Sequence, residues 1–181
     1  LPPESRIRVV QLGAAMTTEA DREARALMQT EPRYRWLGER GHADAMRWLG
    51  RSHAMVISSR MEGGAHVVSE AIAAGVPVIA SGIAGNIGLL ADAYPGYYPV
   101  GNERALAALL SRAENDSEFI HSLEAAVKAQ RGVTDAAAER LWRSLAVSAA
   151  DGSARVFDSP EKVVRFLSGP PKARRKSRPR R

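Results

Sequence analysis

Residues 58–82 read SSRMEGGAHVVSEAIAAGVPVIASG, and this stretch decides the fold. It overlaps the end of the apolar run AMVISS (54–59), which predicts a buried strand. Residues 64–74 predict a helix that ends at Gly75, and PVIAS (77–81) predicts a second buried strand. Two buried strands joined by a helix through short connections predict a parallel pair in an α/β sheet.

Strand and helix alternate in this way over roughly the first 100 residues. Two further strands are predicted at Ile7–Gly13 and Tyr34–Gly38, and helices are predicted from Thr18 and over residues 42–52. The predicted fold class is therefore α/β, with a Rossmann-like, doubly wound parallel sheet, helices on both faces and ligands at the carboxyl ends of the strands. The helical C-terminal part is predicted to follow a loop at 81–88 and a turn at 94–101, with helices at 103–113, 117–130, 135–149 and 159–167.

The formal net charge of +6 is concentrated at the C-terminus. Residues 172–181 hold seven of the 26 basic side chains and no acidic one, which leaves 19 basic against 20 acidic side chains elsewhere. We therefore expect a near-neutral folded domain over residues 1–168 and a disordered basic tail over 169–181. The tail is most simply a solvated extension, and non-specific binding to RNA or membrane phosphates is the alternative.

Composition narrows the possible functions further. Cysteine is absent and the four histidines lack zinc-binding spacing, so disulfides and thiolate metal sites are excluded and a zinc centre is not expected. No apolar run approaches the roughly 18 to 20 residues of a membrane span, and no secretory signal is present. We expect a cytoplasmic protein. Because the first residue is Leu1 rather than Met, we also expect the chain to begin within a larger protein.

Two glutamates flank a Gly-Gly pair where the helix at 64–74 is predicted to begin. Gly63-Gly64 lets the backbone approach a ligand without a Cβ, and the free N–H groups of a helix start suit a diphosphate. Glu70 lies roughly 9 Å along the helix axis, where its two oxygens could accept both ribose hydroxyls, while Glu62 could accept hydroxyls of a sugar. Alternatively, the glycines form only a turn and Glu70 pairs with Arg60 or another cation. A metal site fits less well, because no third carboxylate or histidine ligand is obvious nearby.

The longer pattern resembles the C-terminal domain of GT-B glycosyltransferases, in the large group 1 family that uses nucleotide-sugar donors. It combines a strand, S-x-x-x-E-G, seven residues between two glutamates, and E-A-x-A-x-G-x-P-V-I-A-S. The resemblance extends from about Ile7 to Ala113, with YRWLG (34–38) where the family has a strand ending in Leu-Gly. The matching residues are Ser58, Glu62, Gly63, Glu70, Ala71, Ala73, Gly75, Pro77, Val78, Ile79 and Ser81.

This resemblance implies that the chain binds a UDP-sugar donor without a divalent metal or any other cofactor. Glu70 would hold the ribose, and Glu62, as a catalytic residue, would face the donor sugar. The backbone around Leu37 and Gly38 would meet the base, which is usually uracil in this family. The diphosphate and the sugar would lie against the amides of Gly63, Gly64 and Ala65.

The chain departs from the family pattern after Glu62, where EGGAH stands in place of the usual E-G-F-G-L. The missing aromatic side chain leaves more room at the sugar, and His66 adds a polar group beside the helix start. His66 is either a surface or capping histidine, or a catalytic-site residue that contacts the diphosphate or an anionic acceptor.

Within the family, MEGGAHVVSEA (61–71) with GNIGLL (85–90) and YPGYYPVG (94–101) resembles the selenosugar synthases of selenoneine biosynthesis. That subgroup resemblance implies transfer of a hexose or N-acetylhexosamine from UDP to selenophosphate. It makes His66, Asn86 and the Ser81-Gly82 loop candidate contacts for the anion.

The family also has an N-terminal Rossmann-like half, and a strand and loop that supply an Arg and a Lys to the diphosphate. Neither is found in this chain, so we expect it to be the donor-binding half, inactive by itself because these cations stabilise the leaving group. The acceptor would be a small molecule or an anion. Two alternatives remain: a GT-B sugar-nucleotide epimerase or phosphorylase, and a nucleic-acid-binding module that uses the tail. The near-neutral body weighs against nucleic acid.

Overall fold

The structure is a computed structural model that describes residues 1–61 and 66–149. The chain divides into two compact units, Leu1–Arg131 and Gly132–Arg181. The helix expected at 159–167 and the tail expected at 169–181 lie outside the described residues. Among the helices that the structure describes, none has the length and apolar character of a membrane span.

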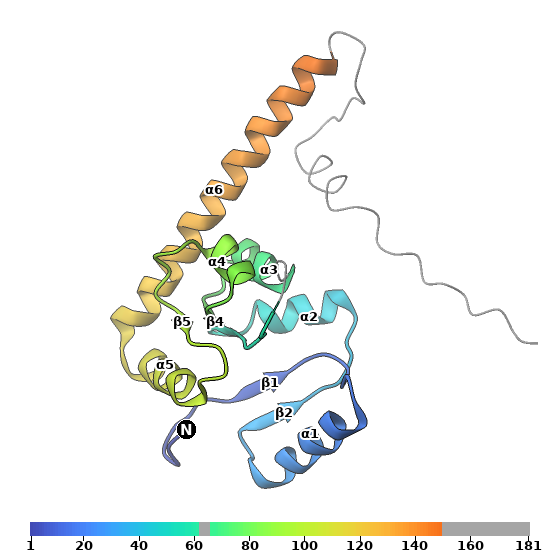
Figure 1. The fold of residues 1–181 in the computed structure, drawn as a ribbon, viewed down its shortest axis with the longest axis vertical. Helices are drawn as coiled ribbons and strands as arrows, with labels where there is room; N and C mark the ends of the chain where they lie inside the picture. Colours follow the sequence, from blue (N-terminus) through green and yellow to red (C-terminus); the bar gives the residue numbers. More distant parts are fainter. Residues whose placement is uncertain (62–65, 150–181) are drawn as a thin grey trace, which may run out of the picture. The chain divides into compact units, whose positions relative to one another are not determined.

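The N-terminal part of unit Leu1–Arg131 contains a parallel pair of short strands joined by a helix (Figure 1). Thr17 caps this helix, because its hydroxyl accepts a hydrogen bond from the Ala20 N–H at 3.1 Å. The helix thus begins at Thr18, as predicted, and it ends at Thr30, shortly before Pro32. The elements are β1 (Val9–Gln11), α1 (Thr18–Thr30), β2 (Tyr34–Trp36) and α2 (His42–Leu49).

The following residues form a second parallel sheet, in which the fully buried β4 lies between β3 and β5. Helices α3, α4, α5 and the start of α6 supply the apolar side chains that enclose it, including Val68, Leu90 and Phe119. The α/β class with parallel strands and flanking helices is therefore confirmed. The elements are β3 (Met55–Ile57), α3 (His66–Ala74), β4 (Val78–Ser81), α4 (Ala84–Leu90), β5 (Tyr97–Tyr98), α5 (Glu103–Asn115) and α6 (Ser117–Ala149).

Tyr94, in the loop before β5, forms hydrogen bonds with the first residue of β4. Its buried hydroxyl donates to the Val78 carbonyl at 2.6 Å and accepts from the Val78 N–H at 2.9 Å. Gly96 belongs to the same loop and packs against both groups. A Cβ built on it would stand 2.4 Å from the Val78 carbonyl oxygen and 2.6 Å from the Tyr94 ring. The backbone there approaches β4 too closely for any side chain, which explains a glycine at this position.

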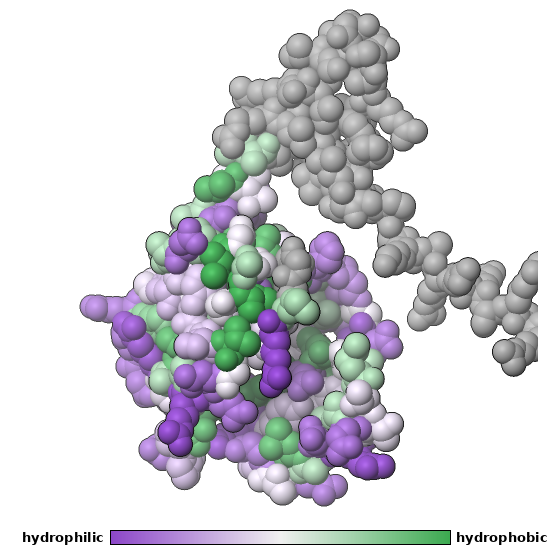
Figure 2. Space-filling model, viewed as in Figure 1, coloured by the Kyte–Doolittle hydropathy of each residue, from purple (hydrophilic) through white to green (hydrophobic). Residues whose placement is uncertain are grey.

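The strands form two sheets, β1-β2 and β3-β4-β5, where the sequence predicted one. Because alternate residues of a parallel strand bond to opposite sides, Val10 and Val56 direct their N–H and C=O groups away from the observed partners. Val9, Val10 and Val56 are 40%, 37% and 42% exposed. Apolar side chains also reach the surface at several places on the face drawn in Figure 2. Within the described residues, β1 and β3 therefore each keep one open edge.

Three local predictions are wrong. The loop expected at 81–88 contains helix α4, whose inward positions Asn86 and Leu90 are both buried. The turn expected at 94–101 contains strand β5. The helices expected at 117–130 and 135–149 are one continuous helix, α6, because Gly132 lowers helix stability by only about 1 kcal/mol relative to alanine and no proline intervenes.

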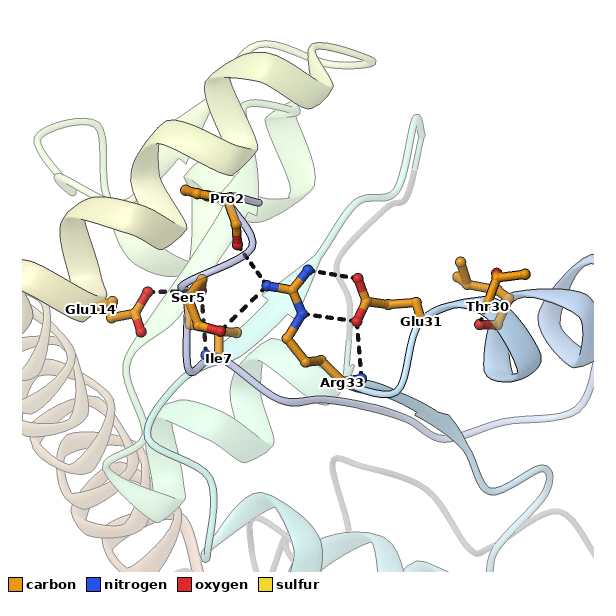
Figure 3. Close-up of polar contacts among 8 residues, drawn as sticks. Pro2, Ser5, Ile7, Thr30, Glu31, Arg33 and Glu114 are labelled. Atoms are coloured by element: carbon orange, nitrogen blue, oxygen red, sulfur yellow. Dashed lines mark hydrogen bonds and ion pairs between the residues drawn. The ribbon is translucent and has the colours of Figure 1, made fainter.

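A polar cluster holds the N-terminal segment against the fold (Figure 3). The Arg33 guanidinium donates to the carbonyls of Pro2 and Ser5 and pairs with Glu31 through two nitrogens at 2.6 and 2.8 Å. The Glu114 carboxylate at the end of α5 accepts from the Ser5 hydroxyl at 2.8 Å and from the Arg6 N–H. The segment before β1 is thus tied to both parts of the unit.

Candidate functional site

The carboxyl ends of β3 and β4 are joined by a buried network of polar groups. The Ser81 hydroxyl donates to the Ser59 carbonyl at 2.6 Å, and the Asn86 amide nitrogen donates to the Ser81 carbonyl at 2.9 Å. The Tyr98 hydroxyl donates to the Ile57 carbonyl at 3.3 Å. Burial raises the pKa of Tyr98, and a hydrogen bond with Ser58 offsets part of that rise. These contacts fix the sheet edge where ligands of parallel sheets bind.

Asn86 and Ser81 belong to this framework and do not face solvent. Both are fully buried, and the Asn86 amide nitrogen makes both of its contacts with Ser81. The Asn86 Oδ1 is buried without a hydrogen-bond partner in the described part of the chain. The structure therefore does not support the expectation that these two side chains contact an anionic acceptor directly.

Glu70 lies on α3, and its carboxylate faces α2 rather than a closed core. Its side chain is 35% exposed, and its Oε1 lies 3.5 Å from Nδ1 of His42, the first residue of α2. The buried residues of α3 are Val68, Ala71 and Ile72, so Glu70 does not lie on the buried face of the helix. The free-energy cost of burying a carboxylate is therefore avoided. The sequence offered Arg60 or another cation as a partner for Glu70. The contact that the structure describes is with the His42 ring, and no contact with Arg60 is found among the described residues.

His66 is the first residue of α3 and is exposed. Its position at the helix start agrees with the predicted place beside a ligand, and exposure leaves the surface and ligand-contact interpretations both open. Four other predicted site residues, namely Glu62, Gly63, Gly64 and Ala65, lie outside the described residues.

The predicted base-binding loop follows β2 and is held to β1 by its own backbone. The Leu37 N–H donates to the Gln11 carbonyl, and the Gly38 carbonyl accepts from the Gly13 N–H, each at 2.9 Å. Gly38 has φ of +68°, a left-handed conformation that glycine adopts readily. Of the backbone N–H and C=O groups of Leu37 and Gly38, only the Leu37 carbonyl and the Gly38 N–H have no hydrogen-bond partner in the described part of the chain. A base could therefore form backbone hydrogen bonds only with these two groups.

An open pocket with a cavity volume of about 640 Å³ adjoins Gly38. Trp36 forms one wall, with its indole N–H donating to the Gly13 carbonyl at 2.9 Å. The Arg25 guanidinium stacks over the Trp36 ring and pairs with Asp21 at 2.6 Å. The lining residues are Ala14, Ala15, Met16, Thr17, Thr18, Asp21, Trp36, Gly38 and Glu39.

Sequence reasoning missed His42 and this pocket. A signal for His42 was available, because it follows the end of a predicted strand by a few residues and the ends of parallel strands share one sheet edge. The pocket had no such signal, since it depends on how the loops after β1 and β2 meet.

Metal ligands do not gather in the described residues: no group of three or more His, Asp or Glu side chains there could hold an ion. Since Glu62 is outside those residues, donor binding without a metal stays a prediction.

Comparison with known proteins relates the chain to one family. A sequence profile described as "Glycosyl transferases group 1" matches residues 5–130, which is more than half of the chain. No curated protein sequence matches the chain.

Several solved structures share the fold. HepE of Anabaena, crystallised with UDP, is 23% identical with a TM-score of 0.61, over 72% of this chain and 36% of its own. HepE with UDP-glucose gives 22% identity and the same TM-score of 0.61, again over 72% and 36%. Sucrose-phosphate synthase from Thermosynechococcus elongatus is 20% identical with a TM-score of 0.60, over 78% of this chain and 39% of its own. The chain thus spans little more than a third of the length of these structures, and the likeness shows the fold.

Proposed function

The chain belongs to the glycosyl transferases group 1 family, and from that premise we propose that it is the donor-binding half of a glycosyltransferase that uses a UDP-sugar. UDP is proposed because the family resemblance favours uridine nucleotides and because HepE, which shares the fold, was crystallised with UDP and with UDP-glucose.

One juxtaposition carries the proposal. Glu70, which the resemblance assigns to the ribose, contacts His42, and His42 follows Gly38 in the base-binding loop by four residues. A base and its ribose are covalently joined, so their contacts must lie close together. Contact between helices α2 and α3 supports the proposal that these two segments bind one nucleoside.

The proposed reaction transfers the sugar from UDP to an acceptor. The bond between the anomeric carbon and the β-phosphate oxygen breaks, and its electron pair leaves with UDP. An acceptor nucleophile forms the new bond to the anomeric carbon and loses its proton, if it carries one, to a base or to water. Glu62 and His66 are the proposed catalytic residues, and the amides of Gly63, Gly64 and Ala65 would face the diphosphate and the sugar.

For the acceptor we propose a small or anionic molecule, and more narrowly selenophosphate, with a hexose or N-acetylhexosamine as the transferred sugar. In that case a selenium–carbon bond replaces the carbon–oxygen bond, and the immediate product is a sugar whose selenium still carries the phosphate. Hydrolysis of its selenium–phosphorus bond by water would then release phosphate and give the selenosugar. Only the subgroup resemblance at residues 61–71, 85–90 and 94–101 supports this narrower proposal.

The full enzyme is proposed to contain an N-terminal Rossmann-like half, and the cytoplasm is its proposed location. The length ratio favours a second half, since the structures that share the fold are more than twice as long as the matched part of this chain. The Arg and Lys that the family's strand and loop ahead of this segment supply would stabilise the departing UDP. This chain alone is therefore proposed to bind UDP weakly and to catalyse little turnover.

Isothermal titration calorimetry with UDP tests the proposal on the chain itself. Glu70→Ala removes the acceptor of two hydrogen bonds to a charged group, so we expect UDP affinity to fall about 10- to 100-fold. Glu23→Ala, which removes an exposed carboxylate from α1, is the control and should leave the affinity unchanged. Addition of EDTA should also leave it unchanged. Equal affinity of the wild-type and Glu70→Ala proteins would refute the ribose role.

Two further measurements separate the alternatives. Product analysis with the full-length enzyme distinguishes transfer to an acceptor from epimerisation of the nucleotide sugar and from phosphorolysis. Deletion of residues 170–181 tests the nucleic-acid alternative: tail-dependent RNA binding together with no UDP affinity would favour it over the glycosyltransferase.

A further inference from the structure

The contact between His42 and Glu70 lies at the proposed ribose site, and neither the family pattern nor the sequence assigned a role to His42. The imidazole Nδ1 lies 3.5 Å from the carboxylate Oε1, across the contact between α2 and α3. The side chains are 75% and 35% exposed, so both can be reached from solvent. Gly41, the residue before His42, has no side chain with which to cap α2.

The chemistry of the two atoms restricts the contact. A carboxylate oxygen only accepts hydrogen bonds, so an attractive contact requires a hydrogen on Nδ1, in either the neutral or the charged ring. The carboxylate offers about four acceptor positions, and a hydrogen bond from His42 would occupy only one of them. Enough positions stay open on Glu70 for two ribose hydroxyls while His42 remains in place.

We infer that His42 is a positioning residue, which holds the Glu70 carboxylate in the orientation that accepts the two hydroxyls of a nucleoside ribose. This inference rests on the proposed function. A free glutamate side chain loses rotamer freedom when it binds a ligand, and that loss weakens binding. The His42 contact restricts Glu70 before the ligand arrives, so less freedom is lost on binding.

A role in stability alone does not account for the contact. A largely exposed ion pair or hydrogen bond of this kind contributes little to folding. Removal of His42 should therefore leave the melting temperature nearly unchanged while it weakens UDP binding. These two quantities separate positioning from a structural role.

A double-mutant cycle in UDP affinity is the decisive experiment, with His42→Ala, Glu70→Ala and the double variant measured by calorimetry. We expect His42→Ala to weaken UDP binding about three- to tenfold. In the Glu70→Ala background the same substitution should have no effect, because its target is gone. His42→Asn, whose amide nitrogen stands close to the position of Nδ1, should restore most of the affinity. His53→Ala, at an exposed histidine before β3, is the control.

Pyrophosphate provides a second ligand for the same variants. It has no ribose, so its affinity should be equal in wild-type and His42→Ala protein. Tighter UDP binding by His42→Ala, or an equal effect of His42→Ala with and without Glu70, would overturn the inference.

Nitrogen-15 NMR of the histidine rings tests the contact without any nucleotide. We expect a hydrogen on Nδ1 of His42 in the wild-type protein and its loss or redistribution in Glu70→Ala. If wild-type protein does not bind UDP, the proposed function fails and the ribose role of His42 fails with it. If UDP binds but the cycle shows no coupling, only the inference about His42 fails.

Discussion

Substitution of Gly96 by alanine tests how tightly the loop before β5 is packed against β4. The new Cβ would stand 2.4 Å from the Val78 carbonyl oxygen, 2.6 Å from Tyr94 Cε1 and 3.0 Å from Leu123 Cδ2. Real Cβ atoms almost never come within 3.0 Å of such atoms, so something must move. The first atom belongs to the backbone of a fully buried strand, and the second belongs to the ring that fastens this strand. Neither can move without the loss of a buried hydrogen bond.

The expected loss follows from these contacts. Overpacking of a core typically costs about 1 to 3 kcal/mol, and an unsatisfied buried hydrogen-bonding group adds about 1 to 3 kcal/mol. We therefore expect Gly96→Ala to lower the free energy of unfolding by about 3 kcal/mol or more. For a chain of this size the melting temperature should fall by about 6 to 12 °C. Thermal melts followed by circular dichroism measure the shift.

Gly88→Ala is the matched control. Gly88 lies in α4 and is exposed, and a Cβ at this position would meet no atom within 4 Å apart from its chain neighbours and the backbone of its own helix. Because alanine is the better helix former by about 1 kcal/mol, this substitution should raise the melting temperature slightly. A Gly96→Ala protein that melts within about a degree of wild type would refute the packing argument.

Three further predictions concern other parts of the structure. Tyr94→Phe leaves the Val78 N–H and C=O without their buried partner and should lower the free energy of unfolding by about 2 kcal/mol or more in urea titrations. The hydrogen bonds between Glu31 and Arg33 lower the pKa of the Glu31 carboxyl from 4.5 to about 2. The stability that this pair contributes is therefore present above pH 4.5 and is lost as the pH falls toward 2. The difference in melting temperature between wild type and Glu31→Gln should accordingly close over that range. Hydrogen exchange should be fast at the open-edge amides of Val10 and Val56 and slow at the amides of β4.

The parts of the fold that depend on local pattern could be predicted from the sequence. Strands β3 and β4 follow from continuous apolar runs, and α3 follows from its apolar periodicity and the glycine at 75, which has φ of +72°. The position of Glu70 within α3 follows from the same pattern. Its partner does not, because His42 meets Glu70 only after two helices pack together.

Helix α4 shows where local reasoning fails. Gly85 and Gly88 favour a loop, because glycine is a poor helix former. Tertiary contacts overcome this preference, since Leu90 packs in the core and Asn86 bonds to the end of β4. The bonds of Asn86 bring the start of α4 to the sheet edge, a relation that residue preferences cannot express.

Strand β1 differs from its prediction for a related reason. The run Ile7–Gly13 has the apolar character of a strand buried on both faces, yet all three residues of β1 are exposed. A strand in a parallel sheet is buried when it has neighbours on both edges and helices over both faces, and β1 has a neighbour on one edge only within the described residues. An apolar sequence indicates that a strand is buried in the complete protein. Within the described residues, β1 has a neighbouring strand on one edge only, so its apolar side chains stay exposed. In the two-domain enzyme proposed above, polypeptide outside these residues would have to cover Val9, Val10 and Val56. Protection of the Val10 and Val56 amides in the full-length enzyme, but not in this chain, is the result that this reasoning requires.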